Sequence, residues 1–160
     1  MHYKLALLSV ALFSGVANAA TCTAEQKKAV SAAYETFRSA SRAGDLNQVK
    51  ALSTAAITAQ IAEFEKTTPN SASLARMMGA LSPALAEGTH IRCEQRQRKA
   101  RLIIDTVAVN KSSGKQVPVA SIVMFEQGHG NAWLVGMKGS TTPFSAQPLD
   151  TLLQNDAFRL

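Results

Sequence analysis

Half of the residues in one short segment near the middle of the chain carry positive charge. From Arg92 to Arg101 the sequence holds five cations and a single acid, Glu94. Arginine can hold a carboxylate or a phosphate through two parallel hydrogen bonds, so a segment of this kind is typical of a surface that binds an acidic partner. We therefore predict a partner-binding surface made of Arg92, Arg96, Arg98, Lys99 and Arg101.

The same segment also fits a purely structural role. Strand alternation gives it no apolar face, and an exposed strand uses such cations to stay soluble and to discourage pairing with other strands. Both interpretations stay open. Nucleic acid is not expected as the partner, because no aromatic residue lies among the cations to stack on bases. An acidic protein surface or another anionic component of the cell envelope is expected instead.

The two cysteines, Cys22 and Cys93, form an even pair. In an exported protein such a pair is expected to be a disulfide, here closing a loop of about 70 residues. A metal site is not expected, because alternation on a strand places His90 and Cys93 on opposite faces and a disulfide consumes the thiolate that a metal needs. No cofactor is expected either.

Residues 1–19 have the pattern of a bacterial secretory signal peptide. A basic start at Lys4 leads into an apolar run over 5–13, and the small residues of 17–19 make a cleavage site. The run is too short to cross a bilayer, so no transmembrane segment is expected. Removing 1–19 takes away Lys4 and lowers the formal net charge of +6 by one. The expected location is therefore periplasmic or secreted.

Helical periodicity dominates the first half of the mature chain and predicts four helices. Thr23 and Gln26 have the spacing of a capping box at the start of the first helix, and Gly44 suits its end. The later helices are expected to begin near Asp45, Ala55 and Ser71.

From Thr89 the pattern becomes extended, with expected strands over 89–97, 100–110, 116–127 and 131–137. Helices followed by strands predict an α+β fold with an antiparallel sheet of about four strands. We assign one domain to 20–138 and a C-terminal extension with a short helix to 139–160. The extension is expected to pack back on its own domain. The alternative is docking on another protein or on a second copy, which would give a homodimer.

In order and spacing, these elements resemble the nuclear transport factor 2-like superfamily. The resemblance rests on Tyr34 and Phe37 in the first helix, the break at 43–45 and the Trp133 segment that ends the last hairpin. It implies a cone in which helices pack into a curved antiparallel sheet, often around a pocket. The residues expected to line that pocket here are Tyr34, Phe37, Phe64, Phe125 and Trp133.

Some members of this superfamily are enzymes. Isomerase-like members carry a tyrosine seven residues before the glycine of the break, where this chain has Phe37, and an acid in a region that here, over 53–58, has none. The chain also lacks a phosphate loop, a GxSxG elbow and an HExxH motif. We predict no catalytic residues. The alternative is an unrecognised enzyme of the superfamily, centred on Tyr34, His90 or Glu126.

Together these patterns favour an exported, non-catalytic binding protein that makes protein contacts in the bacterial envelope. An accessory subunit of an envelope complex and an inhibitor or immunity protein against a secreted toxin fit equally well. A carrier of small hydrophobic ligands is a further alternative.

Overall fold

The computed structural model describes residues 19–68, 70–80, 82–109, 113–140 and 149–160. Within these ranges the chain forms five α-helices and a five-stranded antiparallel sheet of order β1-β2-β3-β4-β5. The predicted α+β class with an antiparallel sheet is therefore confirmed. The expected signal peptide lies outside the described residues, apart from Ala19.

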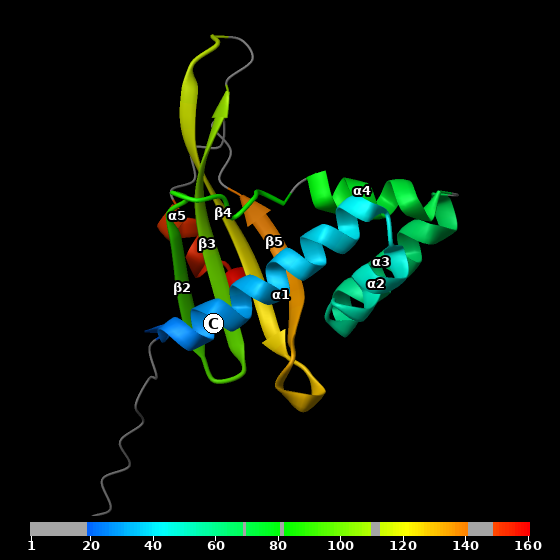
Figure 1. Ribbon diagram of the computed structural model, residues 1–160, viewed down its shortest axis with the longest axis horizontal. Helices are drawn as coiled ribbons and strands as arrows, with labels where there is room; N and C mark the ends of the chain where they lie inside the picture. The colour runs from blue at the N-terminus through cyan, green and yellow to red at the C-terminus, as the bar shows by residue number, and fades with distance from the viewer. Residues whose placement is uncertain (1–18, 69, 81, 110–112, 141–148) are drawn as a thin grey trace, which may run out of the picture.

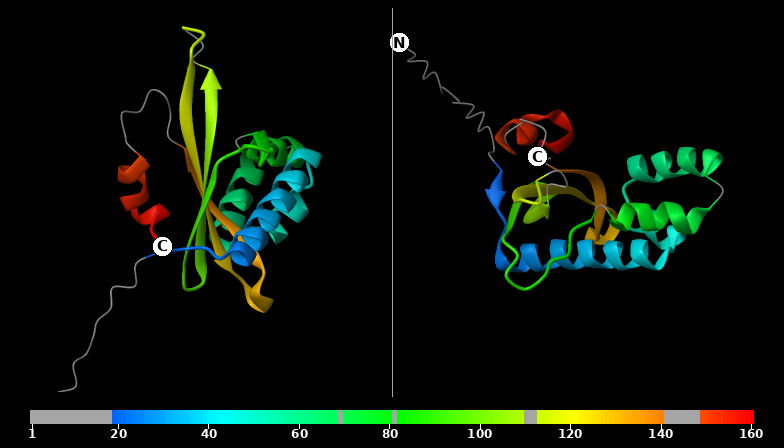
Figure 2. Two further views of the ribbon diagram at one scale, coloured as in Figure 1. Left: turned by 60° about the vertical axis from the view of Figure 1, so that its left-hand side comes forward. Right: turned by 90° about the horizontal axis from the view of Figure 1, so that it is seen from above.

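The first of the four N-terminal helices crosses one face of the sheet, and the other three lie beside the edge formed by the last strand (Figures 1 and 2). The four helices are α1 (Ala24–Ala43), α2 (Leu46–Ala51), α3 (Ala55–Thr67) and α4 (Ser71–Ala80). The predicted capping box begins α1: the Thr23 Oγ1 accepts a hydrogen bond from the Gln26 N–H at 3.2 Å, and the Gln26 Oε1 accepts one from the Thr23 N–H at 2.8 Å. Gly44 ends the helix at φ 80°, a left-handed conformation that suits glycine.

The strands are β1 (Ala20–Thr21), β2 (Ile91–Arg96), β3 (Lys99–Val109), β4 (Gln116–Gln127) and β5 (Trp133–Ser140). A short 3-10 turn, η1 (His129–Asn131), joins the last two. The expected count of about four strands missed β1, which pairs Ala20 with Gln95. Two residues are too few to show a period of two, so nothing in the sequence pattern marks this strand.

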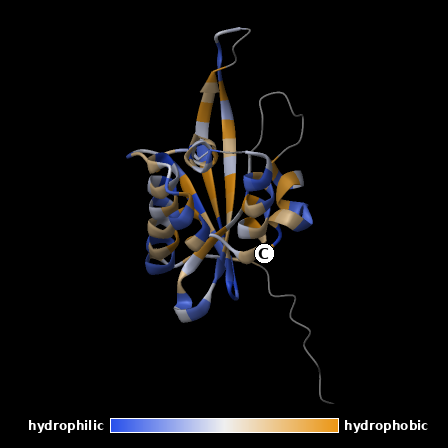
Figure 3. Cartoon of the chain, turned by 90° about the vertical axis from the view of Figure 1, so that its right-hand side faces the viewer, coloured by the Kyte–Doolittle hydropathy of each residue, from blue (hydrophilic) through white to orange (hydrophobic). Residues whose placement is uncertain are grey.

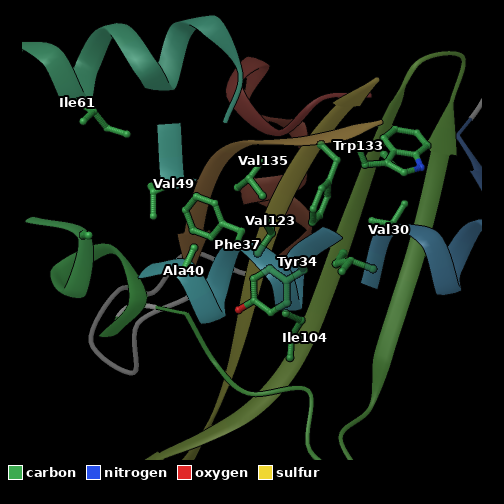
Figure 4. Close-up of a cluster of buried hydrophobic side chains, with 14 of the residues drawn as sticks. Val30, Tyr34, Phe37, Ala40, Val49, Ile61, Ile104, Val123, Trp133 and Val135 are labelled. Carbon is green, nitrogen blue, oxygen red and sulfur yellow. The ribbon is translucent and has the colours of Figure 1, made fainter. Parts of the chain in front are cut away.

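The main core lies between the helices and the sheet (Figure 4). Val30, Tyr34 and Phe37, spaced three or four residues apart on α1, are completely buried against strand residues such as Leu102 and Ile104. The predicted disulfide between Cys22 and Cys93 is confirmed, and it ties the segment before α1 to β2.

The C-terminal extension lies on the opposite face of the sheet (Figure 2). Its helix α5 (Leu149–Gln154) and its 3-10 turn η2 (Asp156–Phe158) form a second, smaller cluster. Phe158 is buried there against Ile122 and Met124 of β4. Gly139 makes room for the aromatic ring, because a Cβ at that position would lie 2.3 Å from the Phe158 Cζ. Within the body of the molecule the sheet is therefore covered on both faces.

Candidate functional site

The basic segment folds into the hairpin of β2 and β3. Arg96 and Lys99 are paired across a two-residue turn made of Gln97 and Arg98. Gln97 adopts a left-handed φ of 53°, which tight hairpin turns require. The turn gathers Arg96, Arg98 and Lys99 at one end of the sheet. Arg92 and Arg101 lie farther along the two strands.

Arg101 is engaged within the chain. Its guanidinium group pairs with the Glu94 carboxylate, with the Nε at 2.6 Å from Oε2, and its Nη1 donates to the Phe158 carbonyl at 2.9 Å. The side chain is only 12% exposed. Arg101 therefore holds the returning tail against β3, a contact that the sequence pattern does not show.

Arg92 and Arg96 are also engaged within the chain. The Arg92 Nη2 lies 3.5 Å from the Asp105 carboxylate, which His90 contacts at 2.6 Å. The Arg96 Nη1 donates to the Leu160 carbonyl at 3.1 Å. These contacts give the segment a structural role, in addition to any role in binding.

Arg98 and Lys99 remain exposed to solvent. The Arg98 Nη2 donates to the Gln127 and Gly128 carbonyls at 2.8 and 2.9 Å, which fixes its position while leaving its outer face open. Within the described part of the chain, the side chain of Lys99 makes no hydrogen bond or ion pair. Its strand neighbour is Glu126, directly opposite on β4.

These side chains surround a solvent-open hollow of about 350 Å³, which we call the turn hollow. Its walls are Arg96, Gln97, Arg98, Lys99, Glu126 and Leu160. Three cations face one acidic side chain, so the hollow favours an anionic group. Compared with the predicted surface, the hollow lacks Arg92 and Arg101 and adds Gln97, Glu126 and Leu160.

The expected ligand pocket is filled by the side chains that were expected to line it (Figure 4). Tyr34 and Phe37 are 0% exposed and Phe125 is 1% exposed, which leaves no water-sized space beside them. Trp133 is also buried. Phe64 is 53% exposed on α3, away from the core. The large side chains of α1 therefore fill the interior where the pocket was expected.

The hydroxyl of Tyr34 is used inside the core. It donates to the Pro83 carbonyl at 2.8 Å, and burial raises the pKa of Tyr34 to about 12. His90 and Glu126, the other residues of the enzyme alternative, are not brought to it. His90 contacts Asp105 of β3, whereas Glu126 lies opposite Lys99 at the start of the same strand. Lys99 and Asp105 are six residues apart, which is roughly 20 Å along β3.

Sequence reasoning missed Lys138, a half-buried lysine against the helices. Its Nζ donates to the Ser82 Oγ at 2.7 Å and to the Met78 carbonyl at 3.1 Å, and lies 4.3 Å from the centre of the Phe37 ring. Burial lowers the pKa of Lys138 to about 8.

A β-bulge explains why Lys138 was missed. Phe125 pairs with Val135 and Val123 pairs with Lys138, so two residues of β5 oppose the single residue Met124. The extra residue reverses the alternation and turns Lys138 to the helix side. Gly136 lies within the bulge, and a glycine inside a strand is the feature of the sequence that could have indicated it.

In the described ranges, no group of three or more His, Cys, Asp or Glu residues is placed to hold a metal ion. Of the helices in those same ranges, none has the length and hydropathy of a membrane span. Comparisons with protein-family models, curated proteins and solved structures found no match.

Proposed function

We propose that this chain is an exported binding protein whose turn hollow receives an acidic group of a partner protein. The observation that carries the proposal is the gathering of Arg96, Arg98 and Lys99 around one hollow, with Lys99 exposed and unpaired among the described residues. A carboxylate entering the hollow would gain charge-assisted hydrogen bonds from groups that are already held in place.

Binding fits the molecule better than catalysis or transport of a small ligand. An enzyme or a carrier of the cone superfamily needs interior space, and Tyr34 and Phe37 occupy it. The candidate catalytic groups Tyr34, His90 and Glu126 lie apart. The proposal therefore places the activity on the surface.

The proposed compartment is the bacterial periplasm or the extracellular space. The disulfide between Cys22 and Cys93 is compatible with an oxidising compartment, and the pattern of residues 1–19 is that of a signal peptide. In that setting the chain could act as an accessory subunit of an envelope complex or as a toxin inhibitor or immunity protein, and in either role it would bind an acidic face of its partner. Helices packed on an antiparallel sheet also agree with the proposed cone and with membership of the nuclear transport factor 2-like superfamily.

Charge reversal at the turn hollow tests the proposal. Arg98→Glu combined with Lys99→Glu leaves the tail contacts of Arg96 and Arg101 intact. We expect it to weaken binding of a synthetic oligoglutamate peptide by about tenfold or more, measured by calorimetry at low salt. A partner captured from envelope extract, identified by mass spectrometry and purified, should lose affinity in the same way.

Lys28→Glu combined with Arg42→Glu is the matched control, since both residues are exposed on α1 and the change in net charge is the same. Equal weakening by both double variants would indicate a general charge effect. Unchanged binding by the Arg98 and Lys99 variant would overturn the proposal.

A further inference from the structure

The distal halves of β3 and β4 project from the body as a two-stranded ribbon (Figure 1). Pairing of β2 with β3 ends at Ile91 and Ile104, followed by a last hydrogen bond from the Asp105 N–H to the His90 carbonyl at 3.0 Å. Pairing of β5 with β4 ends at Ser140 and Ser121. In the described sheet, residues 105–109 of β3 therefore pair only with residues 116–120 of β4. We call them the ribbon.

The ribbon is rich in apolar side chains for a segment so exposed to solvent (Figure 3). Val107 is 62% exposed and Val109 is 60% exposed. They share one face with the exposed Pro118, and Val117 and Val119 lie on the other face. An isolated two-stranded ribbon is marginally stable in water, so a partner that covers these side chains would stabilise it.

Only one edge of the ribbon can accept a full strand. The Asp105 amide points outward toward His90, and alternation along an antiparallel strand directs the amides of Val107 and Val109 the same way. Neither amide has a hydrogen-bond partner among the described residues. On the opposite edge the outward position across from Val107 is Pro118, which has no N–H to donate. The open edge is therefore that of β3.

The charge of the ribbon indicates what kind of segment fits. Between Asp105 and Glu126 the sequence contains two lysines and no acid, and Lys115 is exposed at the distal end of β4. We propose that an extended, acidic segment of a partner protein adds a strand along Val107 and Val109, with a carboxylate near Lys115. The main chain of β3 would supply hydrogen bonds, and the valines would supply apolar contact.

Two other occupants fit less well. A second copy could pair edge to edge, but five residues from each chain bury far less than the roughly 800 Å² per partner typical of a stable interface. A lipid surface approached tip-first would meet the polar residues Ser113 to Lys115 before the valines. The proposal does not depend on the turn hollow, which lies at the other end of β3.

The test is a titration of the isotope-labelled protein with a short capped peptide of alternating valine and threonine that carries an aspartate at each end. We expect the amide signals of Val107 and Val109 to shift and their hydrogen exchange to slow. The same peptide with alternate backbone nitrogens methylated is the control, because it cannot form the strand hydrogen bonds. It should bind at least about tenfold more weakly.

Two variants locate the site on the protein. Val107→Pro removes an outward N–H that β4 does not use, so the ribbon should persist while peptide binding is lost. Lys115→Glu should weaken binding by about tenfold, and Lys28→Glu should leave it unchanged. Equal binding of both peptides, or unmoved Val107 and Val109 signals, would overturn the proposal. Dimerisation through the ribbon that depends on protein concentration would assign the edge to a second copy instead. Binding to anionic vesicles that Lys115→Glu abolishes would assign it to a lipid surface.

Discussion

Individual cations in this protein differ in what they contact, although the sequence presents them as one basic block. Arg101 and Arg96 hold the C-terminal extension through the Phe158 and Leu160 carbonyls, and Arg98 holds the turn before η1. The side chain of Lys99 is exposed to solvent, and the proposed function assigns it to a partner. Side-chain hydrogen bonds to carbonyls far away in the sequence have no local signature. For this reason the sequence shows that the segment is basic, but it does not show which carbonyl each arginine contacts.

Lys138 gives the stability of the fold a pH dependence. Its pKa is about 8 in the folded protein and 10.5 ordinarily, so between these values the unfolded chain binds more protons. Stability therefore rises with pH in this window, and the free energy of unfolding should increase by about 2 kcal/mol from pH 8 to pH 10. The raised pKa of Tyr34 acts in the opposite direction above pH 10. Urea unfolding at several pH values measures the effect.

Lys138→Met is the matched variant, since it keeps an unbranched chain over Phe37 and removes the titrating amine. Its unfolding free energy should lose this pH-dependent contribution between pH 8 and pH 10. The same rise in the variant and in the unmodified protein would assign the dependence to other groups.

Elements with a clear period or cap were predictable, and those that depend on tertiary contact were not. The first helix follows from Thr23, Gln26 and Gly44. The fourth helix begins at Ser71, near the predicted start, and its capping side chain is Asn70, whose Oδ1 accepts a hydrogen bond from the Ser73 N–H at 3.0 Å. β1 and the bulge in β5 form against neighbouring strands, so local sequence does not specify them.

The attachment of the C-terminal extension depends on the absence of a side chain at Gly139. Gly139→Ala would place a Cβ within 2.3 Å of the Phe158 ring, so we expect the ring to shift and the extension to loosen. The expected destabilisation is about 1 to 3 kcal/mol. Hydrogen exchange over 149–160 should speed up, with little change in α1.

A second substitution separates crowding from other effects of the alanine. Phe158→Leu combined with Gly139→Ala provides a smaller side chain at the contact and should slow exchange again relative to Gly139→Ala alone. Unaltered exchange in Gly139→Ala would mean that the Phe158 contact does not hold the extension.

At the scale of the whole molecule, the disulfide joins residues 71 positions apart. Crosslinking restricts the unfolded chain, and for a loop of this length the entropy model gives about 4 kcal/mol. We expect Cys22→Ser combined with Cys93→Ser to lower the free energy of unfolding by about 3 to 5 kcal/mol in a denaturant titration. Intact mass after alkylation, with and without reductant, should show two masked thiols.

Reduction of the unmodified protein is the parallel measurement, and it should give the same loss of stability as the double serine variant. Equal unfolding curves for oxidised and reduced protein would show that the bridge does not stabilise the fold.

Ala20 and Leu160 both lie beside β2. They contact neighbouring residues of that strand. Ala20 lies opposite Gln95, and the Leu160 carbonyl accepts from the next residue, Arg96. Such a chain suits circular permutation: a short flexible linker can join its ends, and new termini can be opened elsewhere. Opening the β3–β4 connection would place the new termini at the tip of the ribbon, where a fused reporter would sit next to the proposed strand-binding edge.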